Sequence, residues 1–173
     1  ESGASCTNDT TANGLGSNGT YSAMSNGSTV YVGTFGGLSV STDNGTSFAN
    51  RTTANGLGHN MVNSVYVVGS TVYAGTGNYG TSGGVSISTD SGASFSNKTT
   101  SNGLGHNHVF SVFASGSNVY AATEGGLAIS TDGGGTFTNK TTSNGLPGNI
   151  IYGVSVYGGT IFACTNVGLG IST

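Results

Sequence analysis

Few residues of this 173-residue chain could carry out catalysis, since it has six carboxylates, three histidines and three basic side chains. Glycoside hydrolysis needs two carboxyl groups flanking one bond, about 5 to 9.5 Å apart. Only Asp9 and Glu124 lie outside a repeated motif, which takes up the other four carboxylates: Glu1, Asp43, Asp90 and Asp132. Asp9 aligns with basic residues of the other repeats, as a surface residue would, and Glu124 begins a turn. We therefore predict no catalytic pair and no enzymatic activity.

The three histidines are the only candidates for a metal site. His59 and His106 are equivalent residues of successive repeats, His108 is close by, and three imidazoles can bind a transition metal. Ser17 and Gly148 occupy the same place in the other repeats. We therefore interpret the histidines as surface or channel-mouth residues and predict no metal and no cofactor.

Charge and composition exclude several classes of partner. With only Arg51, Lys98 and Lys140 as basic residues, the chain cannot neutralise a run of nucleic-acid phosphates or an anionic membrane surface. It has no apolar run of about 18 residues and no signal-peptide pattern. A chain that opens at Glu1, with two cysteines and seven Asn-x-Ser/Thr sequons, is typical of a processed, secreted or cell-surface protein.

A motif of the form Ser-x-Asp-x-Gly-x-Ser/Thr-Phe organises the chain and occurs intact at 41–48, 88–95 and 130–137. A fourth copy is divided between the two ends, where Glu1 replaces the Asp and Cys6 replaces the Phe. The motif acids are 42, 47 and 42 residues apart, and the position after Thr173 lies 42 residues beyond Asp132. The chain therefore holds four whole repeats, and its C-terminus must meet an N-terminus, its own or that of another copy.

Each repeat contains four strand candidates, which in the second repeat are residues 63–68, 71–76, 84–88 and 94–97. The second candidate has apolar or small residues on both faces, which indicates a strand that is covered on both sides. Repeated four-stranded antiparallel units of about 40 residues are typical of β-propeller blades. We predict an all-β fold with almost no helix, in one domain of residues 1–173. Its fourth blade would combine residues 1–9 with residues 141–173.

The three intact motifs, each preceded by a strand of the type Val72–Thr76 and a Gly-Gly turn, resemble the BNR or Asp-box repeat β-propellers over the whole chain. The resemblance implies a hairpin between the third and fourth strands of each blade, with the Asp bonded back to the turn and the aromatic ring packed under it. It thus implies structural roles for Asp43, Asp90, Asp132, Phe48, Phe95 and Phe137. Four repeats are fewer than the family's usual rings have. The family includes sialidases, which hold a substrate carboxylate with several arginines, whereas this chain has only Arg51.

The two cysteines fall in the same divided repeat. Cys164 takes the place of Gly33, Gly75 and Ala122 on the second strand, and Cys6 takes the place of the motif Phe. We predict a Cys6–Cys164 disulfide that fastens the divided blade. A third strand lies between them, so ideal strands would separate their Cα atoms by about 10 Å, whereas a disulfide needs about 4.4 to 6.8 Å. The bond would then require a distorted N-terminal strand or a contact between chains.

An Asn-x-Thr sequon occupies the same place in every repeat, at Asn8, Asn50, Asn97 and Asn139. One interpretation is glycosylation, and the other is that Asn and Thr cap a turn with their own side chains.

The absence of an evident chemical site favours a non-enzymatic extracellular structural protein that self-associates into a surface layer or filament. Its terminal strand would complete a blade of the neighbouring copy. The alternative is a lectin-like propeller that binds a glycan or another ligand through Asn-rich loops, the extra loop 78–83 and four tyrosines: Tyr21, Tyr79, Tyr152 and Tyr157. Tyrosines between blades are also common core residues. A degenerate glycoside hydrolase is a weaker alternative.

Overall fold

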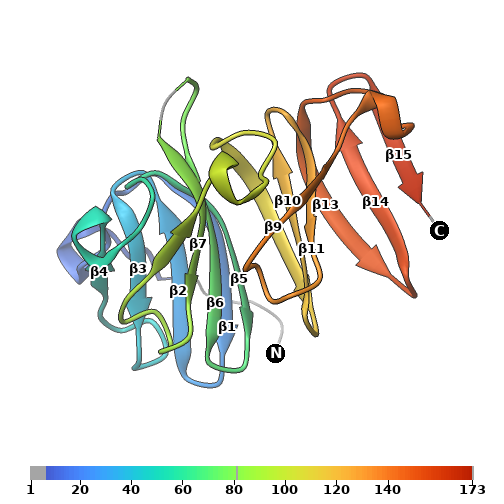
Figure 1. Ribbon diagram of the computed structural model, residues 1–173. Helices are drawn as coiled ribbons and strands as arrows, with labels where there is room; N and C mark the ends of the chain where they lie inside the picture. The colour runs from blue at the N-terminus through green and yellow to red at the C-terminus, as the bar shows by residue number, and fades with distance from the viewer. Residues whose placement is uncertain (1–6, 81, 173) are drawn as a thin grey trace.

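The computed structural model describes residues 7–80 and 82–172, which form antiparallel sheets that follow one another along the chain (Figure 1). The first sheet contains β1 (Thr20–Asn26), β2 (Thr29–Thr34), β3 (Gly37–Ser41) and β4 (Ala49–Arg51). The second contains β5 (Val62–Val68), β6 (Thr71–Gly77), β7 (Gly83–Ser88) and β8 (Ser96–Lys98). The third contains β9 (Val109–Ser115), β10 (Asn118–Thr123), β11 (Gly126–Ser130) and β12 (Thr138–Lys140). The fourth contains β13 (Ile151–Tyr157), β14 (Thr160–Thr165) and β15 (Gly168–Ser172).

The predicted all-β class is confirmed, and the predicted strands of the second repeat agree with β5 to β8 within two residues. The largest difference is β8, which starts at Ser96 rather than at Ser94. The N–H and hydroxyl groups of Ser94 both donate to Asp90, so Ser94 belongs to the turn before the strand.

A short 3-10 helix precedes each sheet, at η1 (Thr11–Asn13), η2 (Thr53–Asn55), η3 (Thr100–Asn102) and η4 (Thr142–Asn144). In each case a Thr hydroxyl caps the N-terminus, the Asn at the third position closes a capping box, and a Gly with positive φ ends the turn. Residues 10–15, 52–57, 99–104 and 141–146 share the sequence Thr-Thr-x-Asn-Gly-Leu, which therefore specifies this conformation in every repeat. Its Leu enters the core in the first three copies, at Leu15, Leu57 and Leu104.

The strands β1, β5, β9 and β13 pack on one another in turn and are the innermost strands of an arc of sheets (Figure 1). We call the face of a sheet that packs on the following sheet its outgoing face, and the opposite face its incoming face. Tyr31, Leu38 and Val40 on the first outgoing face form a core with residues of the second incoming face, which include Val62, Val65 and Val67. Equivalent residues form the next two interfaces. The second strands of the two middle sheets, β6 and β10, are buried on both faces, as predicted for the second repeat: Val72 and Ala74 are fully buried and Tyr73 is 4% exposed.

The fourth sheet has three strands within the described residues, where the other sheets have four. Residues 7–9 are not in a strand, and residues 1–6 lie outside the described part of the chain. The completion of this sheet by residues 1–9 therefore stays a prediction. The first and fourth sheets lie at opposite ends of the arc (Figure 1), and β13 does not pack on β1 as it packs on β9. In the described chain the sheets form an open arc.

None of the described helices has the length and hydropathy that a membrane-spanning helix needs.

Candidate functional site

The aspartates of the three intact motifs are held by their own hairpins. The hydroxyl of Ser88 donates to Asp90 Oδ1 at 2.6 Å, and the hydroxyl of Ser94 donates to Asp90 Oδ2 at 2.6 Å. Asp43 and Asp132 accept the same bonds in their hairpins. The bond from Ser41, followed by those from Ser47, lowers the pKa of Asp43 to about 2. These carboxylates are acceptors of a turn, which is the role that the resemblance implies for them.

The motif hairpins also join successive sheets. The N–H of Phe95 donates to the carbonyl of Asn55 at 2.9 Å, and Gly92 lies against Tyr31 of the preceding sheet. Arg51 Nε donates to the Gly92 carbonyl at 3.0 Å. The Phe95 and Phe137 rings pack on the cores of the two interfaces, and the Phe48 ring is half-buried. The first two internal interfaces therefore each include a motif hairpin from the later sheet laid on the outgoing face of the earlier one.

The sequon asparagines of the intact repeats have structural bonds. The Nδ2 atoms of Asn50, Asn97 and Asn139 donate to the carbonyls of Gly36, Gly83 and Gly125 at 2.8 to 2.9 Å, which ties β4, β8 and β12 to the preceding turns. A glycan on any of these nitrogen atoms would disturb that bond. Asn8, by contrast, is exposed.

The outgoing face of the fourth sheet, which we call the end face, is exposed. Leu169 is 53% exposed and Ile171 is 60% exposed, whereas the equivalent Leu38 and Val40 are 0% and 6% exposed. Phe162, the equivalent of the buried Tyr31, is half-buried. Cys164 is also exposed on β14. Because Cys6 lies outside the described residues, the predicted disulfide stays a prediction.

Beside this face, a groove of about 560 Å³ lies between the third and fourth sheets, and we call it the end groove. It is lined by residues that include Ile129, Lys140, Leu146 and Ile171. Ile129 is the equivalent of Val40 and Ile87, which contact the motif hairpins of the second and third sheets. The end groove is therefore at the place where a motif hairpin of the fourth sheet would lie.

The backbone of Asn144 and Gly145, which line the end groove, also supports the conclusion that a motif hairpin of the fourth sheet would lie there. In the first three repeats, the carbonyls of Asn13, Asn55 and Asn102 accept a bond from the motif Phe. No described residue donates a backbone hydrogen bond to the carbonyl of Asn144. A Cβ on Gly103 would collide with the Phe137 carbonyl oxygen, whereas a Cβ on Gly145 would meet no described atom within 4 Å.

The incoming face of the first sheet, which we call the start face, is the other unpaired sheet face of the described arc. Thr20, Ala23 and Ser25 are exposed there, at the positions where β5 has the buried Val62, Val65 and Val67. Val30 and Val32 of β2 are half-buried beside them. Residues 7–9 lead directly into η1, which is bonded to Phe48 of the same sheet.

A third surface lies at one end of the innermost strands, where a pocket of about 350 Å³ is surrounded by aromatic residues. The second residue of every innermost strand lines it: Tyr21, Asn63, Phe110 and Tyr152. In each strand a register shift falls at this residue. A β-bulge re-aims a side chain, so it explains how four equivalent positions converge on one place. We call this the axial pocket.

Tyr79 and His108 complete the axial pocket with Met61 and Asn78. The Phe110 ring centroid lies 4.2 Å from that of His108 and 5.4 Å from that of Tyr152, and the Tyr79 ring lies 4.9 Å from that of His108. His108 is 3% exposed, and its Nδ1 is 3.3 Å from Glu124 Oε2. Burial is the main cause that lowers the pKa of His108, and the Glu124 carboxylate partly opposes it.

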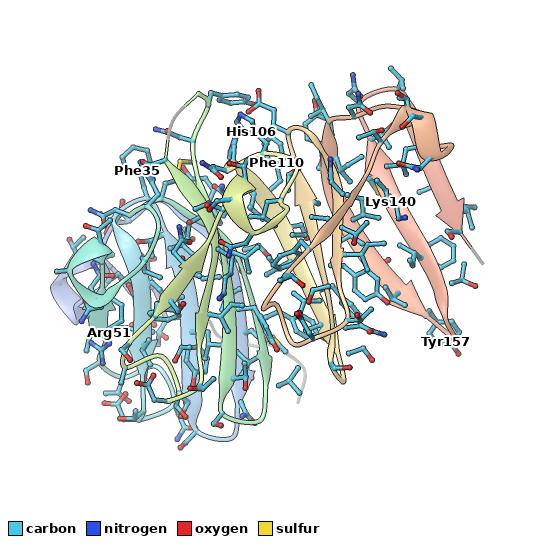
Figure 2. All side chains as sticks on the ribbon, in the orientation of Figure 1. Phe35, Arg51, His106, Phe110, Lys140 and Tyr157 are labelled. Atoms are coloured by element: carbon cyan, nitrogen blue, oxygen red, sulfur yellow. The ribbon has the colours of Figure 1, made fainter. Side chains whose placement is uncertain are left out.

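Figure 2 shows His106 and Phe110 in the same region of the third sheet. His106 Nδ1 is 3.6 Å from Glu124 Oε2, and His59 Nδ1 accepts a bond from the N–H of Met61. Among the described residues, no group of three or more histidine, cysteine or acidic side chains could hold a metal ion. Of the two interpretations, surface or channel-mouth residues, His108 does not fit the first, because it is buried under the aromatic rings and lines the axial pocket.

The structure thus brings together three of the four tyrosines of the ligand-binding hypothesis: Tyr21, Tyr79 and Tyr152. Tyr157 is 85% exposed at the far end of β13, away from the axial pocket (Figure 2). Sequence reasoning missed Asn63 and Phe110. Their equivalence to Tyr21 and Tyr152 in the repeat alignment was the available signal.

No family model and no curated protein matches the chain. It is similar to the extracellular domain of BT3049 from B. thetaiotaomicron, with a TM-score of 0.78 and 20% identity over 94% of this chain and 23% of that chain. An ancestral GH74 enzyme gives a TM-score of 0.66 and 21% identity over 86% of this chain and 22% of that chain. The computationally designed Ika4 protein gives 0.60 and 8% identity over 88% of this chain and 89% of that chain. This chain therefore has the β-propeller fold and spans less than a quarter of the first two proteins.

Proposed function

We propose that the chain is a non-enzymatic, extracellular β-propeller subunit of the Asp-box type that assembles head to tail into a filament. The end face of one copy packs on the start face of the next. The observation that carries the proposal is the exposure of Leu169 and Ile171, whose equivalents are buried in the first interface.

The molecule itself provides the template for this contact, because the outgoing-to-incoming packing is made three times within the chain. The end face presents Phe162, Leu169 and Ile171 where the first sheet presents Tyr31, Leu38 and Val40. The start face carries smaller residues than β5, and the end face has Cys164 where the first two sheets have Gly33 and Gly75. A Cβ added at Gly33 would lie 2.8 Å from the Val62 carbonyl oxygen and 3.1 Å from Val62 Cγ1, so Cys164 requires the contact between copies to be slightly wider there than the first interface.

The N-terminal segment of the second copy fits the end groove. Residues 7–9 precede η1 as 49–51 precede η2, so they correspond to the fourth strand of a sheet that lies on the start face. In the register of β3 with β4, Leu169 would pair with Asp9 and Ile171 with Thr7. Asn8 would donate to the carbonyl of Val167, as Asn50 donates to that of Gly36. Within the described residues β15 is an edge strand, whose free backbone groups favour strand addition.

A head-to-tail contact that does not close on itself generates a filament. The extracellular location is supported by the similar extracellular domain of BT3049 and by the sequence composition. The described carboxylates favour a non-enzymatic role, because the motif aspartates accept bonds from their own turns and Glu124 is engaged by His108. The membership in the Asp-box family is supported by the hairpin bonds of the three intact motifs.

Size measurement and electron microscopy of the purified chain test this proposal. We expect a concentration-dependent series of oligomers that ends in filaments, and we expect Leu169→Asp with Ile171→Asp to yield monomers with an unchanged circular dichroism spectrum. The matched control is Tyr79→Asp, which changes another exposed tyrosine, in the β6–β7 connection and away from the exposed faces of the first and fourth sheets. A chain that stays monomeric at all concentrations would contradict the proposal, as would equal effects of the two kinds of variant.

A further inference from the structure

We propose that the axial pocket binds a neutral saccharide by stacking pyranose rings on its tyrosines. This inference concerns one molecule and does not depend on the proposed self-association.

Exposed aromatic rings in a concave site are the first reason. Tyr79 is 74% exposed, Tyr152 is 51% exposed and Tyr21 is 50% exposed, yet all three line one pocket. Large exposed rings that gather in a hollow indicate a binding site more than a packing defect. The pocket volume of about 350 Å³ is within the range of small-molecule sites.

The rings are held in place before a ligand arrives. Tyr79 contacts His108 edge-on with an interplanar angle of 75°, and Tyr152 contacts Phe110 at 67°. His108 is buried beneath them and is fixed through Glu124. Edge-to-face contacts of this kind stabilise ring orientation. A preorganised site loses less side-chain entropy when it binds.

The charge of the pocket selects the class of saccharide. No Lys or Arg lines its described wall, and Glu124 lies behind His108, so a carboxylate, phosphate or sulfate on the ligand would meet no cationic partner there. Hydroxyl groups, in contrast, would meet the tyrosine hydroxyls and the Oδ1 of Asn63. The Nδ2 of Asn63 already donates to the carbonyls of Gly77 and Val109, both at 2.9 Å, and these bonds hold the amide in position.

Stacking further favours sugars whose ring faces are apolar. A pyranose with all its hydroxyl groups equatorial exposes C–H groups on both faces, and such faces pack on aromatic rings. A β-1,4-linked glucan presents such faces in succession, and the separate tyrosines of β1, β13 and the 78–80 segment offer several rings to receive them. We therefore commit to neutral gluco-configured oligosaccharides.

Titration calorimetry of the full chain with cellohexaose tests the inference, with sialyllactose and an aromatic-rich peptide as the other two ligands. We expect binding of cellohexaose alone, weakened about tenfold by Tyr79→Ala or Tyr152→Ala, which corresponds to about 1.4 kcal/mol for the loss of one stacked ring. The control Tyr157→Ala should leave the affinity unchanged. The tested side chains are exposed, so their loss should not unfold the sheets.

The inference would be overturned by an absence of cellohexaose binding at millimolar concentration, or by binding that all three variants share equally. Preference for sialyllactose would show an anion site, and preference for the peptide would show a protein-recognition site. Either preference would contradict a neutral saccharide.

Discussion

The aspartates of the three intact motifs stabilise turns, and their protonation should therefore destabilise the fold. Asp43 accepts bonds from Ser41 and Ser47, and these bonds lower its pKa to about 2, below the unfolded value of 3.8. The pKa values of Asp90 and Asp132 are lowered for the same reason. A depressed carboxyl pKa adds stability above the unfolded pKa, and this stability is lost as the pH falls through the folded pKa.

We therefore expect the melting temperature to fall as the pH is lowered from about 4 to about 2. Asp90→Asn should reduce both the melting temperature at about pH 5 and its acid dependence, because the amide cannot accept the same set of hydroxyl bonds. Calorimetric scans across this range give the comparison. An identical acid dependence in the variant would show that the motif carboxylates are not responsible.

The lowered pKa of His108 predicts a second effect of pH on stability, at a milder acidity than that of the aspartates. Because burial lowers its pKa from the ordinary value of 6.5, the unfolded chain binds a proton more readily than the folded chain. The stability contributed by neutral His108 is then complete above pH 6.5 and is lost as the pH falls through the folded pKa. The stability difference between about pH 7 and about pH 5 should shrink in His108→Gln, measured by urea unfolding. The more exposed His106→Gln is the control and should retain the difference.

At the scale of elements, equivalent positions in different sheets should respond differently to one substitution. Leu38 is fully buried between the first and second sheets, whereas Leu169 is 53% exposed on the end face. Leu38→Ala should cost about 2 to 5 kcal/mol in the free energy of unfolding, as buried leucines do. Leu169→Ala should cost less than about 0.5 kcal/mol in the dilute monomer, as exposed sites do.

Denaturant unfolding of both variants below the concentration of assembly checks this prediction. In the same experiment at high concentration, Leu169→Ala should weaken association. Equal costs in the monomer would mean that the end face is covered within a single chain.

The strands can be predicted from the sequence because the same patterns of strand and turn residues recur in the four repeats. The strand β6 is predicted at residues 71–76, because the residues from Val72 to Gly75 are apolar or small on both faces. The structure buries both of its faces, as predicted. The sequence predicts almost no helix and does not locate the short 3-10 helices, since the reciprocal Thr and Asn bonds of the capping box become visible only in three dimensions. The axial pocket is predicted in part. The bulges that aim Asn63 and Phe110 inward have no signature in the residue types, so only the tyrosines are recognised.

At the scale of the whole molecule, the described sheets form an arc (Figure 1). Leu169 and Ile171 are exposed on its last sheet, where the proposed assembly requires the first sheet of another copy. Four repeats are evident from the motif spacing, but the relation between the first and last sheets is not. Spacing determines how many sheets there are, whereas the rotation between sheets determines whether one chain closes. This rotation depends on side-chain packing at each interface, and it cannot be predicted from the residue types alone.

A disulfide cross-link through the native Cys164 tests most directly whether the end face of one copy meets the start face of another. A Cβ added at Gly33 would lie 3.1 Å from Val62 Cγ1. Cys164 takes the place of Gly33 on the end face, and Thr20 takes the place of Val62 on the start face. The variant Thr20→Cys, made with Cys6→Ser, should therefore form a disulfide between its new thiol and Cys164 of another copy under mild oxidation. Ser28→Cys in the same background is the control, because Ser28 is exposed in the β1–β2 turn outside the start face.

Non-reducing electrophoresis of the oxidised variants shows which chains the disulfide joins. Head-to-tail assembly predicts a ladder of covalent dimers, trimers and longer products for Thr20→Cys, which reduction returns to a single monomer band, and no ladder for Ser28→Cys. A monomer band that carries an internal disulfide would show that one chain closes on itself, and the absence of any cross-link would show that the two faces do not meet. Either result would contradict head-to-tail assembly.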